Sequence, residues 1–291
     1  MKIKEVGIIG SGQMGNGIAH VSALAGYKVV LIDIAETALT KALETIEKNL
    51  KRQVQREKIS QEEMDKALGN ISTNIDSKAL KNADLIIEAA TENFDLKVKI
   101  FKDILEHIKK DCLLSTNTSS LSITKLAAVT DRPDKFIGLH FMNPVPVMKL
   151  VEIIPGIATS DEMLETTKQF ALSLGKTIAT AEDFPAFIAN RILLPMINEA
   201  VYALYEGVGD IKSIDTSMKL GMGHPMGPLE LADFVGLDTC LAILNVLYEG
   251  FGNPKYSPCP LLVKYVEAGW YGVKSGKGFY DYSGDKPVPT R

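Results

Sequence analysis

The chain has 291 residues, of which 46% are hydrophobic and 23% are charged, and its formal net charge is −4. This composition is typical of a folded protein with one large or two moderate domains, and the slight acidity argues against binding to nucleic acid or an anionic membrane. Three scattered cysteines, Cys112, Cys240 and Cys259, exclude a disulfide framework or a metal cluster. Because no apolar run approaches the roughly 20 residues of a membrane span or resembles a signal peptide, we expect a soluble, cytoplasmic protein.

Short apolar runs alternate with helical stretches over the first 180 residues. This alternation is typical of a Rossmann-type, doubly wound and mostly parallel α/β sheet. The charged stretch 34–77 breaks the rhythm, and we interpret it as a helical hairpin insertion between two strands. Strands are predicted at 6–10, 28–33, 83–90, 112–117, 135–141, 149–154 and 176–181.

The pattern changes near Pro185. The segment RILLPMINEAVYALYEG (191–207) predicts a long apolar helix, and a second apolar helical stretch follows a proline- and glycine-rich turn. No strand alternation remains in this part of the sequence. We therefore predict a Rossmann domain at 1–185 and an all-helical C-terminal domain at 186–291.

The segment GIIGSGQMGNGIA (7–19) contains the pattern G-x-G-x-x-G at Gly10, Gly12 and Gly15. It follows an apolar strand and opens a helix, which is the context that a dinucleotide-binding loop requires. The first glycine permits a tight turn, the second lets backbone N–H groups approach a pyrophosphate, and the third lets the helix pack closely. The alternative is a glycine-rich turn without a ligand.

Asp33 ends the second predicted strand, eighteen residues after Gly15. A carboxylate at this position can bind the ribose hydroxyls of adenosine, and it repels a 2′-phosphate. No arginine follows in IDIAETA to hold such a phosphate, so NAD is favoured over NADP. Gln13 and Met14, between the second and third glycines, belong to the same predicted cofactor site.

The segment KNLKRQVQREK (48–58) contains five basic residues and one acid. Lys48, Arg52 and Arg56 recur every four residues, which places them on one face of a helix, with Lys51 alongside. One interpretation is a solvated surface helix. The other is a site for a small polyanionic ligand, such as a phosphorylated adenosine, in an otherwise acidic protein.

His140 lies on one apolar segment, and Glu152 lies on the next, twelve residues later. Two strands joined by a short connection can bring these side chains together, and the carboxylate then fixes the imidazole tautomer and stabilises its protonated form. Such an imidazole can exchange the hydroxyl proton during hydride transfer to or from an alcohol. For His140 alone, a core histidine with satisfied hydrogen bonds would be the preferred interpretation.

Other polar residues point to the same edge of the sheet. Asn117 and Ser119 lie in STNTSSLSI (115–123), which follows a predicted strand, so their side chains emerge where ligands bind in such sheets. Asn190 lies early in an apolar helix, where a buried amide needs hydrogen-bond partners.

With these residues, the chain resembles the 3-hydroxyacyl-CoA dehydrogenase family along essentially its whole length. It looks most like the short bacterial members, which implies NAD(H)-dependent interconversion of (S)-3-hydroxybutyryl-CoA and acetoacetyl-CoA. The motifs that carry the resemblance are GIIGSGQMGNGIA (7–19), NTSSLSI (117–123), GLHFMNPVPVMKLVEII (138–154), FIANRILLPMINEA (187–200), MKLGMGHPMGPLELADFVGLD (218–238) and KSGKGFYDY (274–282).

The resemblance also implies roles for individual residues. His140 would be the general acid/base paired with Glu152, and Ser119 and Asn190 would bind the substrate oxygens at the reacting end. The helical domain would form a homodimer or higher homo-oligomer and close over the substrate. Further cofactor contacts would come from Glu92, Lys97, Asn117, Ser119, Asn143 and Lys274. Contacts to the acyl-CoA would come from Lys51, Arg52, Arg56, Ser119 and Asn143.

Two other functions remain open at this point. A dehydrogenase of a free hydroxy acid or sugar acid would use the same fold, although the basic segment at 48–58 argues against it. A catalytically silent, NAD-binding structural protein is the other, and the intact set of predicted catalytic residues argues against that.

Overall fold

The computed structural model describes residues 2–291. The chain divides into two compact units that meet between Phe184 and Pro185, one residue before the boundary expected from the sequence.

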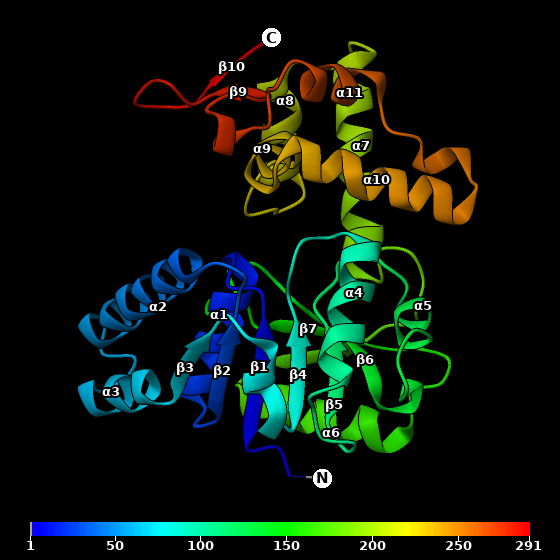
Figure 1. Ribbon diagram of the computed structural model, residues 1–291. Coiled ribbons are helices and arrows are strands. Elements are labelled where there is room, and N and C mark those ends of the chain that lie inside the picture. Colours follow the sequence, from blue (N-terminus) through cyan, green and yellow to red (C-terminus); the bar gives the residue numbers. More distant parts are fainter. Residues whose placement is uncertain (1) are drawn as a thin grey trace. The chain divides into compact units, whose positions relative to one another are not determined.

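The first unit is built on an eight-stranded sheet with the strand order β3-β2-β1-β4-β5-β6-β7-β8 (Figure 1). Strands β1 to β6 run parallel, β7 is antiparallel to β6, and β8 is parallel to β7. All seven strands expected from the sequence are present, with ends shifted by one or two residues. The strands are β1 (Glu5–Ile9), β2 (Lys28–Ile32), β3 (Ile71–Asn74), β4 (Leu85–Glu88), β5 (Leu113–Thr116), β6 (Phe136–Phe141), β7 (Leu150–Pro155) and β8 (Thr177–Thr180).

The strand order reverses between β1 and β4. The chain moves from β1 outward to β2 and β3, and then returns to continue from β4 on the other side of β1. Ligands of open α/β sheets bind beside the carboxyl ends of the strands at such a reversal. The fold therefore places the expected ligand site at this edge of the sheet.

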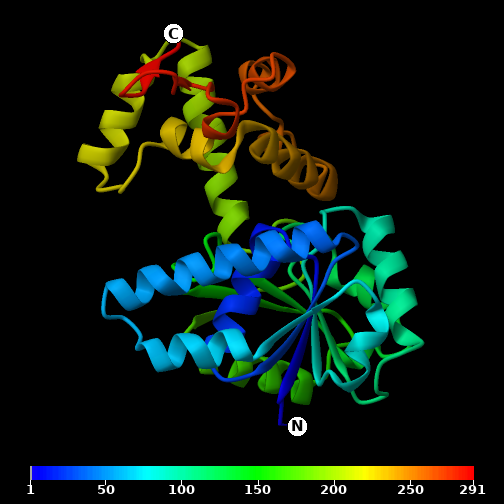
Figure 2. The same cartoon turned by 60° about the vertical axis from the view of Figure 1, so that its left-hand side comes forward.

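The charged stretch 34–77 contains the predicted helical hairpin, but the hairpin is not an insertion. It consists of α2 (Glu36–Gln55) and α3 (Gln61–Gly69), which lie side by side (Figure 2), and it leads directly into β3. Because β3 pairs in parallel with β2, the hairpin is the crossover that joins these two strands. The strand β3 was not predicted from the sequence, because its four residues, ISTN, are half-buried or exposed and lack an apolar signal.

Helices cover both faces of the sheet. One face packs against α1 (Gln13–Leu24), α2, α3 and α6 (Asp161–Ser173) in a single apolar core. The opposite face carries α5 (Ile123–Ala127), against which Gly138 of β6 packs so closely that a Cβ there would lie 2.7 Å from the Ile123 side chain. Also in this unit are α4 (Phe94–Leu105) and the short 3-10 helices η1 (Ser77–Asn82) and η2 (Pro133–Lys135).

The second unit is helical around its own apolar core, but it is not all-helical as expected. Two short antiparallel strands, β9 (Tyr280–Asp281) and β10 (Val288–Pro289), form a small ribbon near the C-terminus. The backbone N–H groups of Phe279 and Tyr280 donate to the buried carboxylate of Asp233, whose pKa burial raises to about 6. The helices are α7 (Ala189–Tyr205), α8 (Ile211–Thr216), η3 (Ser217–Gly221), α9 (Pro228–Val235), α10 (Leu237–Phe251), η4 (Pro254–Tyr256), α11 (Pro260–Glu267) and η5 (Val273–Ser275).

Among residues 2–291, no single helix is long and apolar enough to cross a membrane. The helices α9 and α10 reach that length and apolarity only as a pair, and the pair is bent by 96°.

Candidate active site

His140 and Glu152 form a buried pair on neighbouring strands. The antiparallel register of β6 and β7 places the two residues directly opposite each other, so their side chains leave the same face of the sheet. The Nδ1 atom of His140 lies 2.8 Å from Oε2 of Glu152, and the two residues are only 6% and 1% exposed. An ionised carboxylate can only accept, so in this contact Nδ1 is the ring nitrogen that carries the proton. The contact expected from the sequence is confirmed.

Asn117 fixes the end of the strand that carries His140. Its side-chain Oδ1 accepts a hydrogen bond of 2.9 Å from the backbone N–H of Phe141, at the last residue of β6. Its own backbone N–H donates to the carbonyl of Glu88 at the end of β4. Asn117 therefore ties three neighbouring strand ends together at the carboxyl edge.

The loop after β5, which carries Ser119, is held by one carboxylate. Oε1 of Glu92 accepts hydrogen bonds from the Thr118 hydroxyl at 2.5 Å, the Ser119 N–H at 2.9 Å and the Ser120 hydroxyl at 3.0 Å. Glu92 lies between β4 and α4, so this contact joins the loops that follow two adjacent strands. Glu92 and Ser119, both predicted site residues, are thus in direct contact.

Lys97 lies inside the protein, in an ion pair that the sequence analysis missed. It is 1% exposed, and its ammonium lies 2.7 and 2.8 Å from the two carboxylate oxygens of Glu88, which is fully buried. Glu88 also accepts from the Thr116 hydroxyl at 2.6 Å, while Glu92 lies 3.5 Å from the same ammonium. The one signal for Glu88 in the sequence is an acid within the otherwise apolar run LIIEAA (85–90).

The glycine-rich loop after β1 has the geometry of a phosphate-binding turn. Gly10 has φ of +96°, and a Cβ there would lie 2.7 Å from the carbonyl oxygen of Ala89, so the turn accepts no side chain. A Cβ at Gly15 would overlap the carbonyl oxygen of Gly10, because α1 approaches the loop closely. A Cβ at Gly12 would meet no described atom within 4 Å, which leaves open space beside the loop for a ligand. These three positions fit a dinucleotide.

Asp33 is held in its ionised form next to this loop. Both the backbone N–H and the hydroxyl of Ser11 donate to its Oδ2, at 2.8 and 2.7 Å. Partial burial acts to raise the pKa of Asp33, but these hydrogen bonds and that from Ala35 outweigh it and hold the pKa below its ordinary value. A charged carboxylate at the end of β2 fits NAD, because it can accept from ribose hydroxyls and repels a 2′-phosphate.

Two further predicted cofactor residues contact each other, although 130 positions separate them. The Gln13 side-chain amide donates to Oδ1 of Asn143 at 3.0 Å, which joins the start of α1 to the connection between β6 and β7. Met14 is half-buried against the apolar core of this unit. The predicted cofactor residues of the first unit thus gather around the carboxyl ends of β1, β2, β4, β5 and β6.

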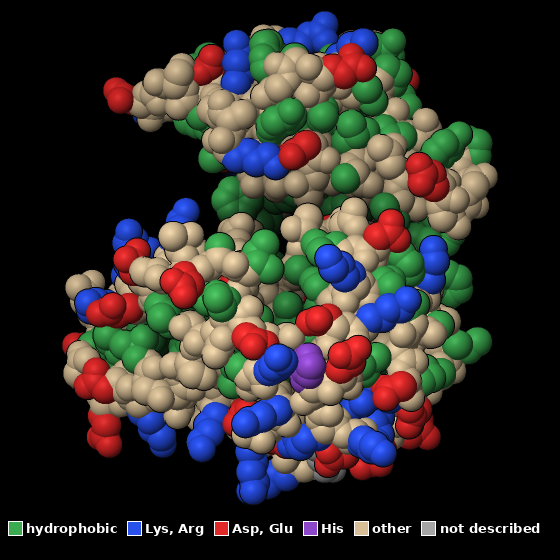
Figure 3. Space-filling model, in the orientation of Figure 1, with side chains coloured by type: hydrophobic (Ala, Val, Ile, Leu, Met, Phe, Trp, Pro, Cys, Tyr) green, Lys and Arg blue, Asp and Glu red, His purple; other side chains and the backbone are tan. Residues whose placement is uncertain are grey.

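The basic residues of α2 are at the surface. Lys48 and Arg52 on α2 are exposed, as is Arg56 directly after the helix. The opposite side of the helix buries Leu39, Ala42, Ile46 and Leu50. Lys51 lies 2.5 Å from Glu47 in an ion pair. Figure 3 shows basic and acidic side chains mixed over α2 rather than a continuous basic patch.

Asn190 and Lys274 belong to the second unit. Asn190 is the second residue of α7 and is half-buried. Lys274 lies in η5 and forms an ion pair of 2.5 Å with Asp238, near the start of α10. No cluster of three or more His, Cys, Asp or Glu side chains suited to a metal ion occurs among residues 2–291.

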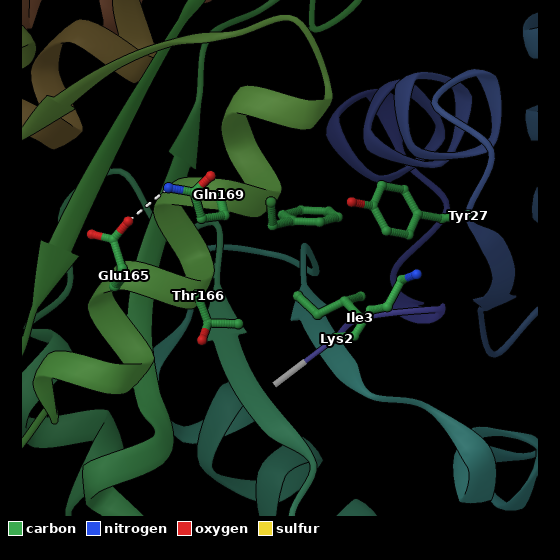
Figure 4. A pocket seen from close by; sticks show the side chains of 7 residues that line it. Lys2, Ile3, Tyr27, Glu165, Thr166 and Gln169 are labelled. Atoms are coloured by element: carbon green, nitrogen blue, oxygen red, sulfur yellow. Dashed lines mark hydrogen bonds between the residues drawn. The ribbon is translucent and has the colours of Figure 1, made fainter.

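A hollow at the other end of the first unit contains none of the predicted site residues. It has a volume of about 360 Å³ and lies beside the amino ends of β1 and β2 and the last turns of α6 (Figure 4). Tyr27 and Phe170, which both line it, pack edge to face with ring centroids 5.2 Å apart. The candidate site therefore remains at the carboxyl edge.

Comparisons with known proteins agree with this geometry. The model for the 3-hydroxyacyl-CoA dehydrogenase NAD-binding domain matches residues 5–184, and the model for the C-terminal domain of the same family matches residues 187–282. A 3-hydroxybutyryl-CoA dehydrogenase of Bradyrhizobium diazoefficiens is 59% identical over 99% of both chains. The human mitochondrial hydroxyacyl-coenzyme A dehydrogenase is 42% identical over 96% of this chain and 91% of its own.

A solved structure is similarly close to this chain. The (S)-3-hydroxybutyryl-CoA dehydrogenase of Ralstonia eutropha superimposes with a TM-score of 0.95 at 49% identity, covering 97% of this chain and all of that one. Sequence, fold and site geometry lead to one assignment: the chain belongs to the 3-hydroxyacyl-CoA dehydrogenase family.

Proposed function

We propose that the protein is an NAD-dependent dehydrogenase that interconverts (S)-3-hydroxybutyryl-CoA and acetoacetyl-CoA. The observation that carries this proposal is the buried contact between His140 and Glu152, at the same carboxyl edge of the sheet as the dinucleotide loop. The names of the relatives at 59% and 51% identity support the four-carbon substrate.

The cofactor would be held by residues that already fit it. Gly10, Gly12 and Gly15 leave room for the pyrophosphate, and Asp33 would accept from the adenosine ribose. Asn143 and Lys274 are further proposed contacts, as are Glu92, Asn117 and Ser119, which would face the nicotinamide half. Lys97 would act from behind, because its ammonium is buried against Glu88. NAD(H) supplies or accepts the hydride at C3 of the substrate.

The protein's own chemistry is then proton transfer at one oxygen. In reduction, the protonated imidazole of His140 would give its Nε2 proton to the oxygen on C3 as that oxygen becomes an alkoxide. In oxidation, the neutral imidazole would take the hydroxyl proton back. Glu152 holds Nδ1–H in both directions and stabilises the imidazolium, so the ring keeps one orientation while its charge changes.

Substrate binding would use groups at both ends of the thioester. Ser119 and Asn190 would donate hydrogen bonds to oxygens at the reacting end. Lys51, Arg52 and Arg56 would meet the phosphates of CoA, a proposal supported by their exposure and by the position of α2 directly after Asp33. Acidic and basic side chains are mixed over α2, so the alternative is that these cations belong to a solvated surface helix that binds no ligand.

We also propose that the second unit pairs with a second copy of the chain. Several of its large apolar side chains are exposed, including Ile192 at 68%, Val208 at 77% and Leu220 at 83%. A mainly apolar hollow of about 440 Å³ lies between α7 and α8 in the same unit. Exposed apolar surface of this kind favours a protein partner, and the mass in solution, against 31.7 kDa for one chain, tests it.

A cytoplasmic location is the remaining part of the proposal. All three cysteines, Cys112, Cys240 and Cys259, are free and buried. Unpaired cysteines are typical of reducing compartments.

One set of assays tests the function directly. We expect the highest kcat/KM with acetoacetyl-CoA and NADH, lower values with the six- and eight-carbon 3-ketoacyl-CoA substrates, and a clear loss with NADPH. Activity on 3-hydroxybutyrate without CoA, at a rate similar to that on the thioester, would instead indicate a dehydrogenase of free hydroxy acids.

A further inference from the structure

The connection between β6 and β7 joins the strand of His140 to the strand of Glu152. It closes on itself through two hydrogen bonds, in which the N–H groups of Val147 and Met148 donate to the carbonyl of Pro144 at 3.0 and 2.9 Å. Two other backbone carbonyls of the connection accept hydrogen bonds from a single lysine.

That lysine is Lys176, which directly precedes β8. Its ammonium donates to the carbonyl oxygens of Val145 at 2.5 Å and Met148 at 2.8 Å, and the residue is 7% exposed. Both of these bonds go to neutral carbonyls. An ammonium inside a protein is unfavourable unless hydrogen bonds compensate for its lost hydration, and burial lowers the pKa of Lys176 accordingly. A lysine at such a position therefore has a specific task, which is to hold these two carbonyls.

The other side of the connection rests on α1. A Cβ at Gly17 would lie 2.8 Å from Cβ of Val145, so the helix packs directly against the residue that Lys176 holds. One turn earlier, the Gln13 amide donates to Asn143 at the start of the connection. Val145 is thus fixed between α1 and Lys176, two residues from the exposed Asn143, whose Oδ1 accepts the hydrogen bond from Gln13.

We infer that Lys176 is a positioning residue for the reaction: by holding Val145 and Met148 from behind, it keeps Asn143 in place at the cofactor site. The inference rests on the proposed function, in which Asn143 contacts the cofactor. Asn143 is exposed and short, so its position depends on the backbone of the connection rather than on packing of its own side chain. Lys176 has no place in proton transfer, and it acts only through this backbone.

The test is a double-mutant cycle between Lys176→Met and Asn143→Ala, with NADH and acetoacetyl-CoA as substrates. Methionine has similar length but no donors, so both carbonyls lose their partner and the connection shifts. We expect Lys176→Met to lower kcat/KM for NADH by roughly tenfold to a hundredfold, because displacements of about 1 Å reduce rates on this scale. In the Asn143→Ala background the same substitution should change kcat/KM by less than about threefold, since the group that Lys176 positions is already gone.

Lys149→Met is the matched control. Lys149 is exposed and lies at the end of the same connection, so its loss should leave kcat/KM and NADH binding unchanged. Should Lys176→Met fail to fold, Lys176→Gln, which reaches at most one carbonyl, takes its place with the same expectations. NADH affinity, measured by fluorescence titration, reports on the position of Asn143 even if acetoacetyl-CoA is not the substrate. A failure of the proposed function can therefore be told apart from a failure of the inference about Lys176.

Two outcomes would overturn the inference. One is a lower melting temperature for the Lys176 variant with kcat/KM within twofold of the wild type, which would make the lysine purely structural. The other is an undiminished effect in the Asn143→Ala background, which would show that Lys176 does not act through Asn143.

Discussion

Two charged regions of the first unit are proposed to meet opposite ends of one substrate, and they differ in almost every physical respect. The pair of His140 and Glu152 is buried and fixed by strand register. The cations Arg52, in the last turn of α2, and Arg56, directly after the helix, are exposed on long side chains. Charges interact strongly where water is excluded and weakly where water and salt screen them. The same kind of substitution should therefore have a large effect in the first region and a small, salt-dependent one in the second.

The largest effect is expected from His140→Gln. Glutamine has similar bulk but cannot carry a proton to and from the substrate oxygen, and general acid/base catalysis contributes about 10² to 10⁴ to the rate. We expect kcat for acetoacetyl-CoA reduction to fall at least a hundredfold while NADH affinity stays within about threefold. A variant with kcat within tenfold of the wild type would contradict the role of His140.

Glu152→Gln should have the second largest effect. The substitution keeps the shape but removes the charge that stabilises the imidazolium. A hydrogen bond to a charged group contributes about 1.5–3 kcal/mol, which corresponds to roughly 10- to 150-fold in rate. We expect kcat to fall within this range, and single-turnover rates with pre-bound NADH measure it. A fall as large as that for His140→Gln would mean that Glu152 has a direct role, whereas no fall would remove it from the mechanism.

The difference between the two regions also explains what the sequence could predict of the fold. Six of the seven predicted strands bury an apolar run, whereas β8 is only half-buried or exposed. The contact of His140 with Glu152 followed from two such buried runs joined by a short connection. The strand β3 was missed because its pairing with β2 through backbone hydrogen bonds leaves little trace in side-chain type. For the same reason, the helical hairpin was misinterpreted as an insertion.

Within the candidate site, the predictable residues are those that face a ligand. The glycines and Asp33 follow a pattern that ligand chemistry dictates, so their spacing is sufficient to find them. The supporting residues Glu88 and Lys176 follow no such pattern, because their partners are set by tertiary packing. A lysine in the sequence is expected at the surface, and only the structure places Lys97 and Lys176 inside.

For the exposed region, we expect a moderate effect from the double reversal Arg52→Glu and Arg56→Glu. If these cations meet the phosphates of CoA, KM for acetoacetyl-CoA should rise by about fivefold to twentyfold at low salt, and the rise should shrink at 0.5 M salt. KM for a truncated pantetheine thioester, which lacks those phosphates, should not change. The helix loses favourable cations at its C-terminal turn, so melting temperatures are measured in parallel.

The matched control for this reversal is Lys99→Glu with Lys102→Glu. Both lysines are exposed on α4 of the same unit, so the net charge changes by the same amount. An equal rise in KM for this control, or for the truncated thioester, would show that α2 is a solvated surface helix that does not bind CoA.

The smallest effect is expected from Lys51→Ala, because Glu47 already neutralises this ammonium at 2.5 Å. Its charge should therefore contribute less to phosphate binding than that of Arg52, and we expect KM for acetoacetyl-CoA to rise by no more than about twofold. The partner substitution Glu47→Ala should act in the opposite direction and lower KM slightly, since it leaves Lys51 free to meet the substrate. Steady-state KM at low salt, with Arg52→Ala alongside, measures both. A larger effect from Lys51→Ala than from Arg52→Ala would mean that the ion pair of Lys51 with Glu47 opens when substrate binds. The exposed region would then rearrange on binding, in contrast to the buried pair of His140 and Glu152.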